Sequence, residues 1–135
     1  MDDRKKNALT TIRKPIYRIP NMKPECTDYL PLSPATMHVL LALTNGDLHG
    51  YGILLEVARQ SQGAYKIGPG TLYDNLKKLL AEGLVEEPDP QGERARREYR
   101  LTKLGGEVLR AETERLSEVV KEARRRLRLS EGARA

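Results

Sequence analysis

The sequence contains no tryptophan and no phenylalanine, and its six tyrosines are its only aromatic residues. A hydrophobic core must therefore be built from Leu, Val, Ile and Ala, which favours packed helices over a large sheet. No run of about 18 apolar residues is present, so we expect no membrane-spanning segment. The N-terminus carries charges but no apolar stretch, so we expect no secretory signal peptide.

Cysteine and histidine are also scarce. Cys26 is the only cysteine, so it cannot form an internal disulfide, and it lacks the partners of a zinc site. A reducing, cytoplasmic setting fits this composition best. Neither His38 nor His49 is spaced as the partner of a nucleophile or a metal, and the turn at residues 68–71 lacks the lysine of a phosphate-binding loop. We therefore expect no enzyme, no cofactor and no metal site.

Positive charge is concentrated at the two ends of the chain. The net charge of +5 divides into +5 for residues 1–23, −6 for residues 24–93 and +6 for residues 94–135. Segregated basic charge is typical of a protein that binds an anionic polymer such as nucleic acid. A solvated tail and an ordinary charged helix would give the same pattern.

The spacing of apolar residues predicts three helices in the first two thirds of the chain. They cover residues 34–44, 48–62 and 71–82, with a short extended piece at 64–67. Ser33 can cap the first helix, and Pro34 suits its first position, where a missing N–H costs little. Gly83 suits the left-handed position that follows the last turn of the third helix.

A β-hairpin and a long helix are predicted next. Residues 84–87 and 98–101 have strand character and flank a loop, and Thr102 can cap a helix at 103–127. That helix would be about 38 Å long at 1.5 Å per residue, longer than the small domain it follows. The order predicts a mainly α fold with a small β-hairpin, a winged helix-turn-helix with an added C-terminal helix. The expected parts are a basic, mostly disordered arm at 1–28, a winged helix-turn-helix domain at 29–101, a dimerisation helix at 102–128 and a tail at 129–135.

The third predicted helix has an apolar side and a polar side. Leu72, Leu76 and Leu79 fall on the apolar side at 100° per residue. The opposite side and its flanks carry Thr71, Tyr73, Asp74, Asn75, Lys77 and Lys78. In a helix-turn-helix this outward side enters the major groove, where Thr, Asn and Lys can hydrogen-bond to bases or phosphates. An ordinary amphipathic surface helix would look the same, and Asp74 could accept from a cytosine amine or cap locally.

The predicted hairpin loop is basic and holds Arg94, Arg96 and Arg97. Planar guanidinium groups suit bidentate contact with phosphate, so the loop is typical of a wing against the DNA backbone or minor groove. A solvated charged turn is the alternative. Tyr51 and Lys66 lie near the edges of the helix-turn-helix, where a tyrosine hydroxyl can donate to phosphate or can simply remain in water.

The long C-terminal helix carries an apolar seam. Its members are Leu109, Leu116, Val120, Ala123 and Leu127. Their spacing favours a partner helix, and a dimer would read two DNA half-sites about one helical turn apart. Glu112 interrupts the seam, so a long regular coiled coil is not expected. Packing against the chain's own core is the alternative.

Five segments in order resemble the PadR-type transcriptional regulators: LSPAT at 32–36, HGYGI at 49–53, GTLY at 70–73, LLAEGL at 79–84 and REYRLT at 97–102. The resemblance covers residues 30–127 and is to the smaller subgroup with one C-terminal dimerisation helix. It implies a homodimer that usually represses its promoter and is released by a small ligand or a stress signal. It also implies the side chains that face DNA: Tyr51, Lys66, Gly70, Thr71, Tyr73, Lys77, Lys78, Arg94, Arg96 and Arg97.

The chain departs from the family pattern at two points. Asp74 stands where a proline or small residue is common, which leaves the base preference open. Some small members of the family bind flat aromatic ligands between tryptophans. This chain has no tryptophan, so that mode of ligand binding should not apply to it. The predicted function is sequence-specific binding of double-stranded DNA at a palindromic operator by a homodimer, with a small-molecule effector as a further partner. The alternatives are a protein-interaction module that uses the winged helix and long helix, and a ligand sensor.

Overall fold

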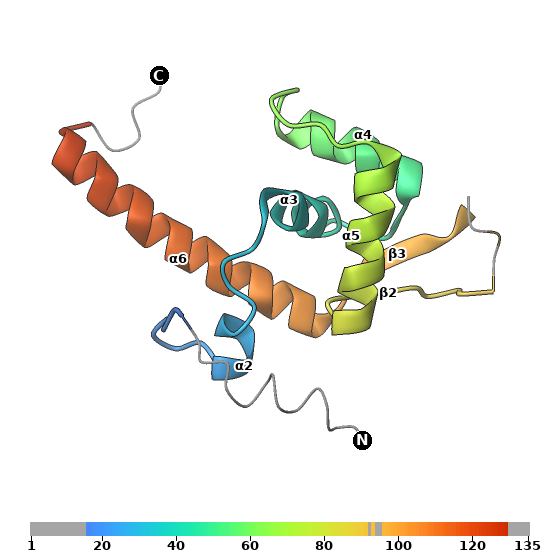
Figure 1. Cartoon of the computed structure of the whole chain (residues 1–135), viewed down its shortest axis with the longest axis horizontal. Helices are drawn as coiled ribbons and strands as arrows, with labels where there is room; N and C mark the ends of the chain where they lie inside the picture. Colours follow the sequence, from blue (N-terminus) through green and yellow to red (C-terminus); the bar gives the residue numbers. More distant parts are fainter. Residues whose placement is uncertain (1–15, 92, 94–95, 130–135) are drawn as a thin grey trace. The chain divides into compact units, whose positions relative to one another are not determined.

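The structure is a computed structural model that describes residues 16–91, 93 and 96–129. The described residues form two compact units, one within 32–110 and the other formed by residues 16–31 with 111–129. The elements are α2 (Pro24–Thr27), α3 (Pro34–Ala42), β1 (Leu48–His49), α4 (Gly50–Gln60), α5 (Pro69–Glu82), β2 (Val85–Glu86), β3 (Glu98–Leu101) and α6 (Lys103–Leu127), as Figure 1 shows. No helix within the described ranges is long and apolar enough to cross a membrane.

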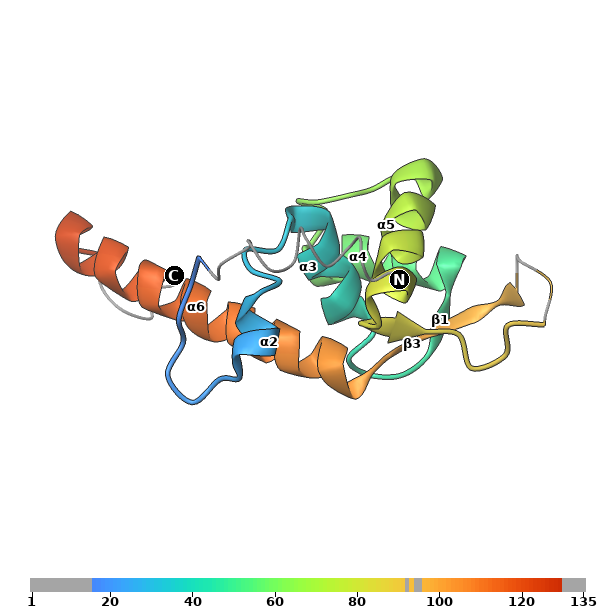
Figure 2. The same ribbon diagram turned by 60° about the horizontal axis from the view of Figure 1, so that its bottom comes forward.

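Helices α3, α4 and α5 group around one core in the larger unit (Figures 1 and 2). Each contributes side chains without solvent contact: Val39, Leu40, Ile53, Val57, Leu72 and Leu79. The predicted start of α3 is confirmed, because the Ser33 hydroxyl accepts from the Thr36 N–H at 3.1 Å and Pro34 takes the first position. Helix α5 begins two residues earlier than predicted, at Pro69, and ends at Gly83 in the left-handed conformation with φ +78°.

The sheet has three strands rather than the two of the predicted hairpin. Its order is β1-β3-β2, and β3 pairs antiparallel with both neighbours. Leu48 pairs with Tyr99 and His49 with Glu98, so the prediction that a helix starts at residues 48–49 was wrong. The extended piece at 64–67 contains no strand. A two-residue strand has no periodicity of its own and exists because β3 supplies its hydrogen bonds.

The first turn of α6 is fixed to the end of α5. The Thr102 hydroxyl accepts from the Gly105 N–H at 2.9 Å and donates to the Gly83 carbonyl at 2.7 Å. The Thr102 N–H donates to the Leu84 carbonyl at 3.1 Å. A Cβ atom at Gly105 would overlap that same carbonyl oxygen. Glycine is therefore required here for close packing, and the predicted cap at Thr102 is confirmed.

The second unit corrects the expectation of a disordered arm through residue 28. Residues 24–27 form α2, with Pro24 at its first position, and Cys26, Thr27 and Leu30 are buried. One helical turn is too short for a periodic signal, so the sequence pattern missed it. Residues 1–15 of the predicted arm lie outside the described residues.

A buried ion pair lies in the same unit. Glu112, which interrupts the predicted seam, is 1% exposed. Its carboxylate accepts from both Nε and Nη2 of Arg115, at 2.6 and 2.9 Å. The Arg115 guanidinium also lies 4.5 Å from the centre of the Tyr17 ring, a cation–π contact. Glu112 is therefore a paired, buried acid and not part of an apolar seam.

Candidate nucleic-acid interface

Helix α5 presents a polar side that its own leucines hold outward. Leu72, Leu76 and Leu79 are at most 1% exposed and fix the rotation of the helix. The opposite side exposes Gly70, Thr71, Asp74, Lys77 and Lys78, as the spacing predicts. One carboxylate and two ammonium groups therefore lie on a surface that the fold leaves open to a partner.

Asn75, on the flank of that side, is tied to the interior. Its side-chain carbonyl accepts a 2.8 Å hydrogen bond from the Thr36 hydroxyl of α3, and the Ser33 hydroxyl donates to Thr36 in turn at 3.1 Å. The start of α3 is thus linked to α5 by a hydrogen bond between Thr36 and Asn75, which are 39 positions apart in the sequence. The side-chain carbonyl oxygen of Asn75, which the sequence predicts to face DNA, is thus used to join two helices. Nothing in the local pattern could have indicated this contact.

Tyr73 lies on the other flank and packs at the start of α4. A Cβ atom at Gly50 would overlap the Tyr73 hydroxyl and lie 2.8 Å from its Cζ atom. Gly50 therefore makes room for the ring, which is half-buried. The backbone N–H groups at this end of α4 form a region that favours anions.

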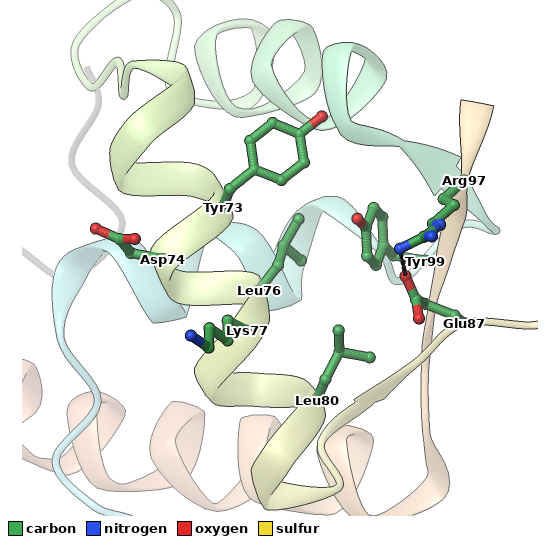
Figure 3. A pocket seen from close by; sticks show the side chains of 8 residues that line it. All are labelled: Tyr73, Asp74, Leu76, Lys77, Leu80, Glu87, Arg97 and Tyr99. Atoms are coloured by element: carbon green, nitrogen blue, oxygen red, sulfur yellow. Dashed lines mark ion pairs between the residues drawn. The ribbon is translucent and has the colours of Figure 1, made fainter. Parts of the chain in front are cut away.

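A groove of about 520 Å³ separates α5 from the hairpin. Its lining residues are Tyr73, Asp74, Leu76, Lys77, Leu80, Glu87, Arg97 and Tyr99 (Figure 3). The lining is apolar at Leu76 and Leu80 and charged at Lys77. On the hairpin side an ion pair joins Arg97 and Glu87 at 3.6 Å. The polar side of α5 and the hairpin are thus neighbours, as a winged helix-turn-helix requires.

The hairpin arginines occupy different settings. Arg96 is exposed, Arg97 is half-buried beside Glu87, and Arg94 lies outside the described residues. Arg96 thus presents its charge to solvent, whereas Arg97 already has a carboxylate partner within the hairpin.

Arg100 on β3 makes a bidentate ion pair with Asp47. Its Nε and Nη2 atoms donate to the two carboxylate oxygens of Asp47, at 3.1 and 2.9 Å. Hydrogen bonding from Arg100 lowers the pKa of Asp47, against a smaller opposing effect of burial. The pair ties the turn before β1 to the hairpin, and no local motif signals it across 53 positions.

The remaining predicted contacts lie on α4 and on the segment after it. Tyr51 is 65% exposed in the first turn of α4, and Lys66 is exposed between α4 and α5. The ring of His49 caps α4 by accepting from the Gly52 N–H at 3.2 Å. His38 stacks on the ring of Tyr65, with the ring centroids 4.5 Å apart. Within the described ranges, no cluster of His, Cys, Asp and Glu is suited to hold a metal.

The predicted dimerisation residues on α6 divide into two groups. Leu109 is 6% exposed, so it belongs to the core of the single chain and not to an open seam. Leu116 is half-buried, and the remaining members, Val120, Ala123 and Leu127, are exposed. Val119 and Leu129 are exposed as well, although the sequence pattern did not single them out. The end of α6 therefore carries apolar side chains without cover in the chain described.

Curated proteins related to this chain are transcriptional regulators where their function is named. The transcriptional regulator Rv3488 of Mycobacterium tuberculosis is 36% identical over 87 residues, which are 64% of this chain and 78% of that protein. A 37.1 kDa protein in transposon TN4556 of Streptomyces fradiae is 40% identical over 78 residues, which are 58% of this chain and 21% of that longer protein.

Solved structures share the fold. A transcriptional regulator from Clostridium thermocellum is 26% identical with a TM-score of 0.59, over 67% of this chain and 87% of that one. RosR of H. salinarum is 26% identical with a TM-score of 0.54, over 70% and 79%. A PadR family regulator from Clostridium difficile is 20% identical with a TM-score of 0.54, over 70% and 98%, and supports the fold alone.

A sequence model of the transcriptional regulator PadR-like family matches residues 39–111. The matched region begins in α3, contains α4, α5 and the hairpin, and extends into α6. Since this match covers more than half of the chain, the chain belongs to the PadR-like family of transcriptional regulators.

Proposed function

We propose that this chain is a homodimeric repressor that binds a palindromic DNA operator in a sequence-specific manner and is released by a small-molecule effector. One observation carries the DNA-binding part. Thr71, Lys77 and Lys78 are exposed together on the side of α5 opposite its buried leucines, beside a hairpin that bears arginines. Repression and release by an effector are supported by the family likeness.

The proposal assigns separate roles to the exposed groups. Thr71 contacts base edges in the major groove, because the N-terminal turn of such a helix points into it. Lys78 follows two turns later on the same side and contacts a base edge farther along the groove. Tyr51, at the anion-favouring start of α4, and Lys66, in the segment before α5, donate to backbone phosphates. Arg96 contacts the backbone or the minor groove from the hairpin, where its guanidinium is already exposed.

The dimer is supported by the exposed end of α6. Val120, Ala123 and Leu127 recur at steps of three and four residues, and Leu127 is 67% exposed. Burying such side chains against a second copy removes apolar surface from water at about 25 cal/mol per Å². A symmetric pair of chains would also present two α5 helices to one palindromic site.

A DNA titration at several salt concentrations tests the proposal. If each dimer contacts about four to eight phosphates, the logarithm of the affinity should fall against the logarithm of salt with a slope of about −4 to −7. Lys77→Gln with Lys78→Gln should weaken binding strongly, whereas the control Lys121→Gln on α6 should not. A monomer in native mass spectrometry that shifts no DNA but forms a stable complex with another protein would contradict the proposal.

A further inference from the structure

The polar side of α5 carries one carboxylate, Asp74, among its cationic and hydroxyl groups. The side chain is exposed, belongs to the middle of the helix, and is one of the residues that line the groove in Figure 3. Among the described residues, Asp74 has no hydrogen-bond or ion-pair partner. Asp74 therefore does not cap a local backbone group, which was one of the two roles that the sequence left open.

Asp74 differs from the paired acids of the other helices, although exposed Glu118 on α6 likewise has no ion pair among the described residues. The acid–arginine pairs Glu56–Arg59, Glu112–Arg115 and Glu122–Arg125, all three residues apart, are closed at 2.6 Å or less. Lys77 and Lys78 stand three and four residues after Asp74, which is a spacing that permits a pair. The carboxylate nevertheless extends into solvent with all of its acceptor positions available.

An unpaired carboxylate on a DNA-binding surface must find a donor, because the phosphates repel it and binding removes its water. In the major groove, guanine offers the acceptors N7 and O6, and thymine offers O4 and a methyl group. Adenine offers its N6 amine beside the acceptor N7. Cytosine alone offers an amine, N4, without an acceptor on the same base. A group that only accepts hydrogen bonds therefore matches cytosine best.

Building on the proposed function, we propose that Asp74 is a specificity-determining residue that selects cytosine at one position of each half-site. It accepts a hydrogen bond from the N4 amine, is repelled by the acceptors of guanine and thymine, and fits adenine less well because N7 lies beside the N6 amine. Because the same carboxylate lies near the phosphates, it also lowers affinity for all other sequences. Asp74 thus sharpens the choice of operator at the expense of non-specific binding.

Selection of bound DNA from a random pool tests this inference. The full chain is compared with Asp74→Ala, Asp74→Asn and the control Glu118→Gln, which removes an exposed carboxylate from α6. We expect the unmodified chain and the control to share one position where cytosine is favoured by about tenfold. Asp74→Ala should reduce that preference below about twofold, and Asp74→Asn should shift it toward adenine, which an amide recognises through N6 and N7.

A second readout is the affinity for DNA without an operator. Asp74→Ala should bind it about two- to threefold more tightly at low salt, because a like charge is removed. Thermal unfolding checks that the variants are folded. We expect unchanged melting temperatures, because the Asp74 side chain is exposed. Selected motifs that keep the same cytosine in Asp74→Ala would overturn this inference and leave the proposed function standing. If the unmodified chain enriches no motif, both are overturned.

Discussion

Replacing Gly105 by alanine should destabilise the protein, although alanine is the better helix former. Its Cβ atom would overlap the Leu84 carbonyl oxygen and lie 2.8 Å from the Leu101 Cδ1 atom. The carbonyl cannot easily move, because it accepts the Thr102 N–H at 3.1 Å. Relief would require the start of α6 to shift away from the end of α5.

Two opposing effects set the size of the change. Forcing a methyl group into a filled space costs about 1–3 kcal/mol, and a backbone obstacle places Gly105 near the upper end. Alanine in place of glycine in a helix returns about 1 kcal/mol. The net loss in the free energy of unfolding should therefore be about 2 kcal/mol.

Urea unfolding followed by circular dichroism measures this change, at one fixed protein concentration so that association does not alter the comparison. With an m-value of about 2 kcal/mol per M, the midpoint should fall by about 1 M. Gly106→Ala is the matched control, since its Cβ atom would meet only the Leu101 Cδ2 atom at 3.9 Å. The control should be neutral or up to about 1 kcal/mol more stable. If the urea midpoint of Gly105→Ala lies at or above that of the unmodified chain, the close contact between residue 105 and the Leu84 carbonyl is refuted.

Three further variants test single contacts. Asp47→Asn should lower the free energy of unfolding at pH 7. Because Arg100 lowers the pKa of the native carboxyl from 3.8, the difference in stability between the two proteins should disappear as the pH falls below that value. A difference in urea unfolding that stays constant down to pH 2 would contradict this. Asn75→Ala should lower the free energy of unfolding by about 1–3 kcal/mol, because the buried Thr36 hydroxyl loses its acceptor. The DNA motif that the variant selects should stay unchanged. An altered motif at normal stability would instead indicate that Asn75 contacts a base. Arg115→Met should lower the free energy of unfolding by about 3 kcal/mol, because the buried Glu112 carboxylate loses the guanidinium of Arg115. Equal thermal stability of the variant and the unmodified chain would contradict this.

Much of the fold could be predicted because local rules determine it. The Ser33 and Thr102 caps, the left-handed Gly83 and the bounds of α6 each depend on residues within a few positions of one another. The apolar stripe of α5 likewise fixed which of its side chains are exposed, including Lys78. Periodicity and capping carry this information without knowledge of the tertiary structure.

The rest depends on contacts between distant segments. Strand β1 exists through its pairing with β3, and the pair formed by Asp47 and Arg100 joins residues 53 positions apart. Asn75 was predicted to face DNA from its position on the flank of α5. Its hydrogen bond to the Thr36 hydroxyl could not be predicted, because Thr36 lies in another helix. Similarly, the seam prediction included Leu109, since spacing alone does not separate a buried side chain from an exposed one.

His49 belongs to two elements at once. Its backbone is in β1, opposite Glu98, while its ring nitrogen holds the first turn of α4 through Gly52. We therefore expect a displacement of β3 to move the start of α4, where Tyr51 lies. The hairpin side and the α4 side of the proposed DNA-binding surface are therefore joined through one residue, so we expect them to adjust to a DNA site together.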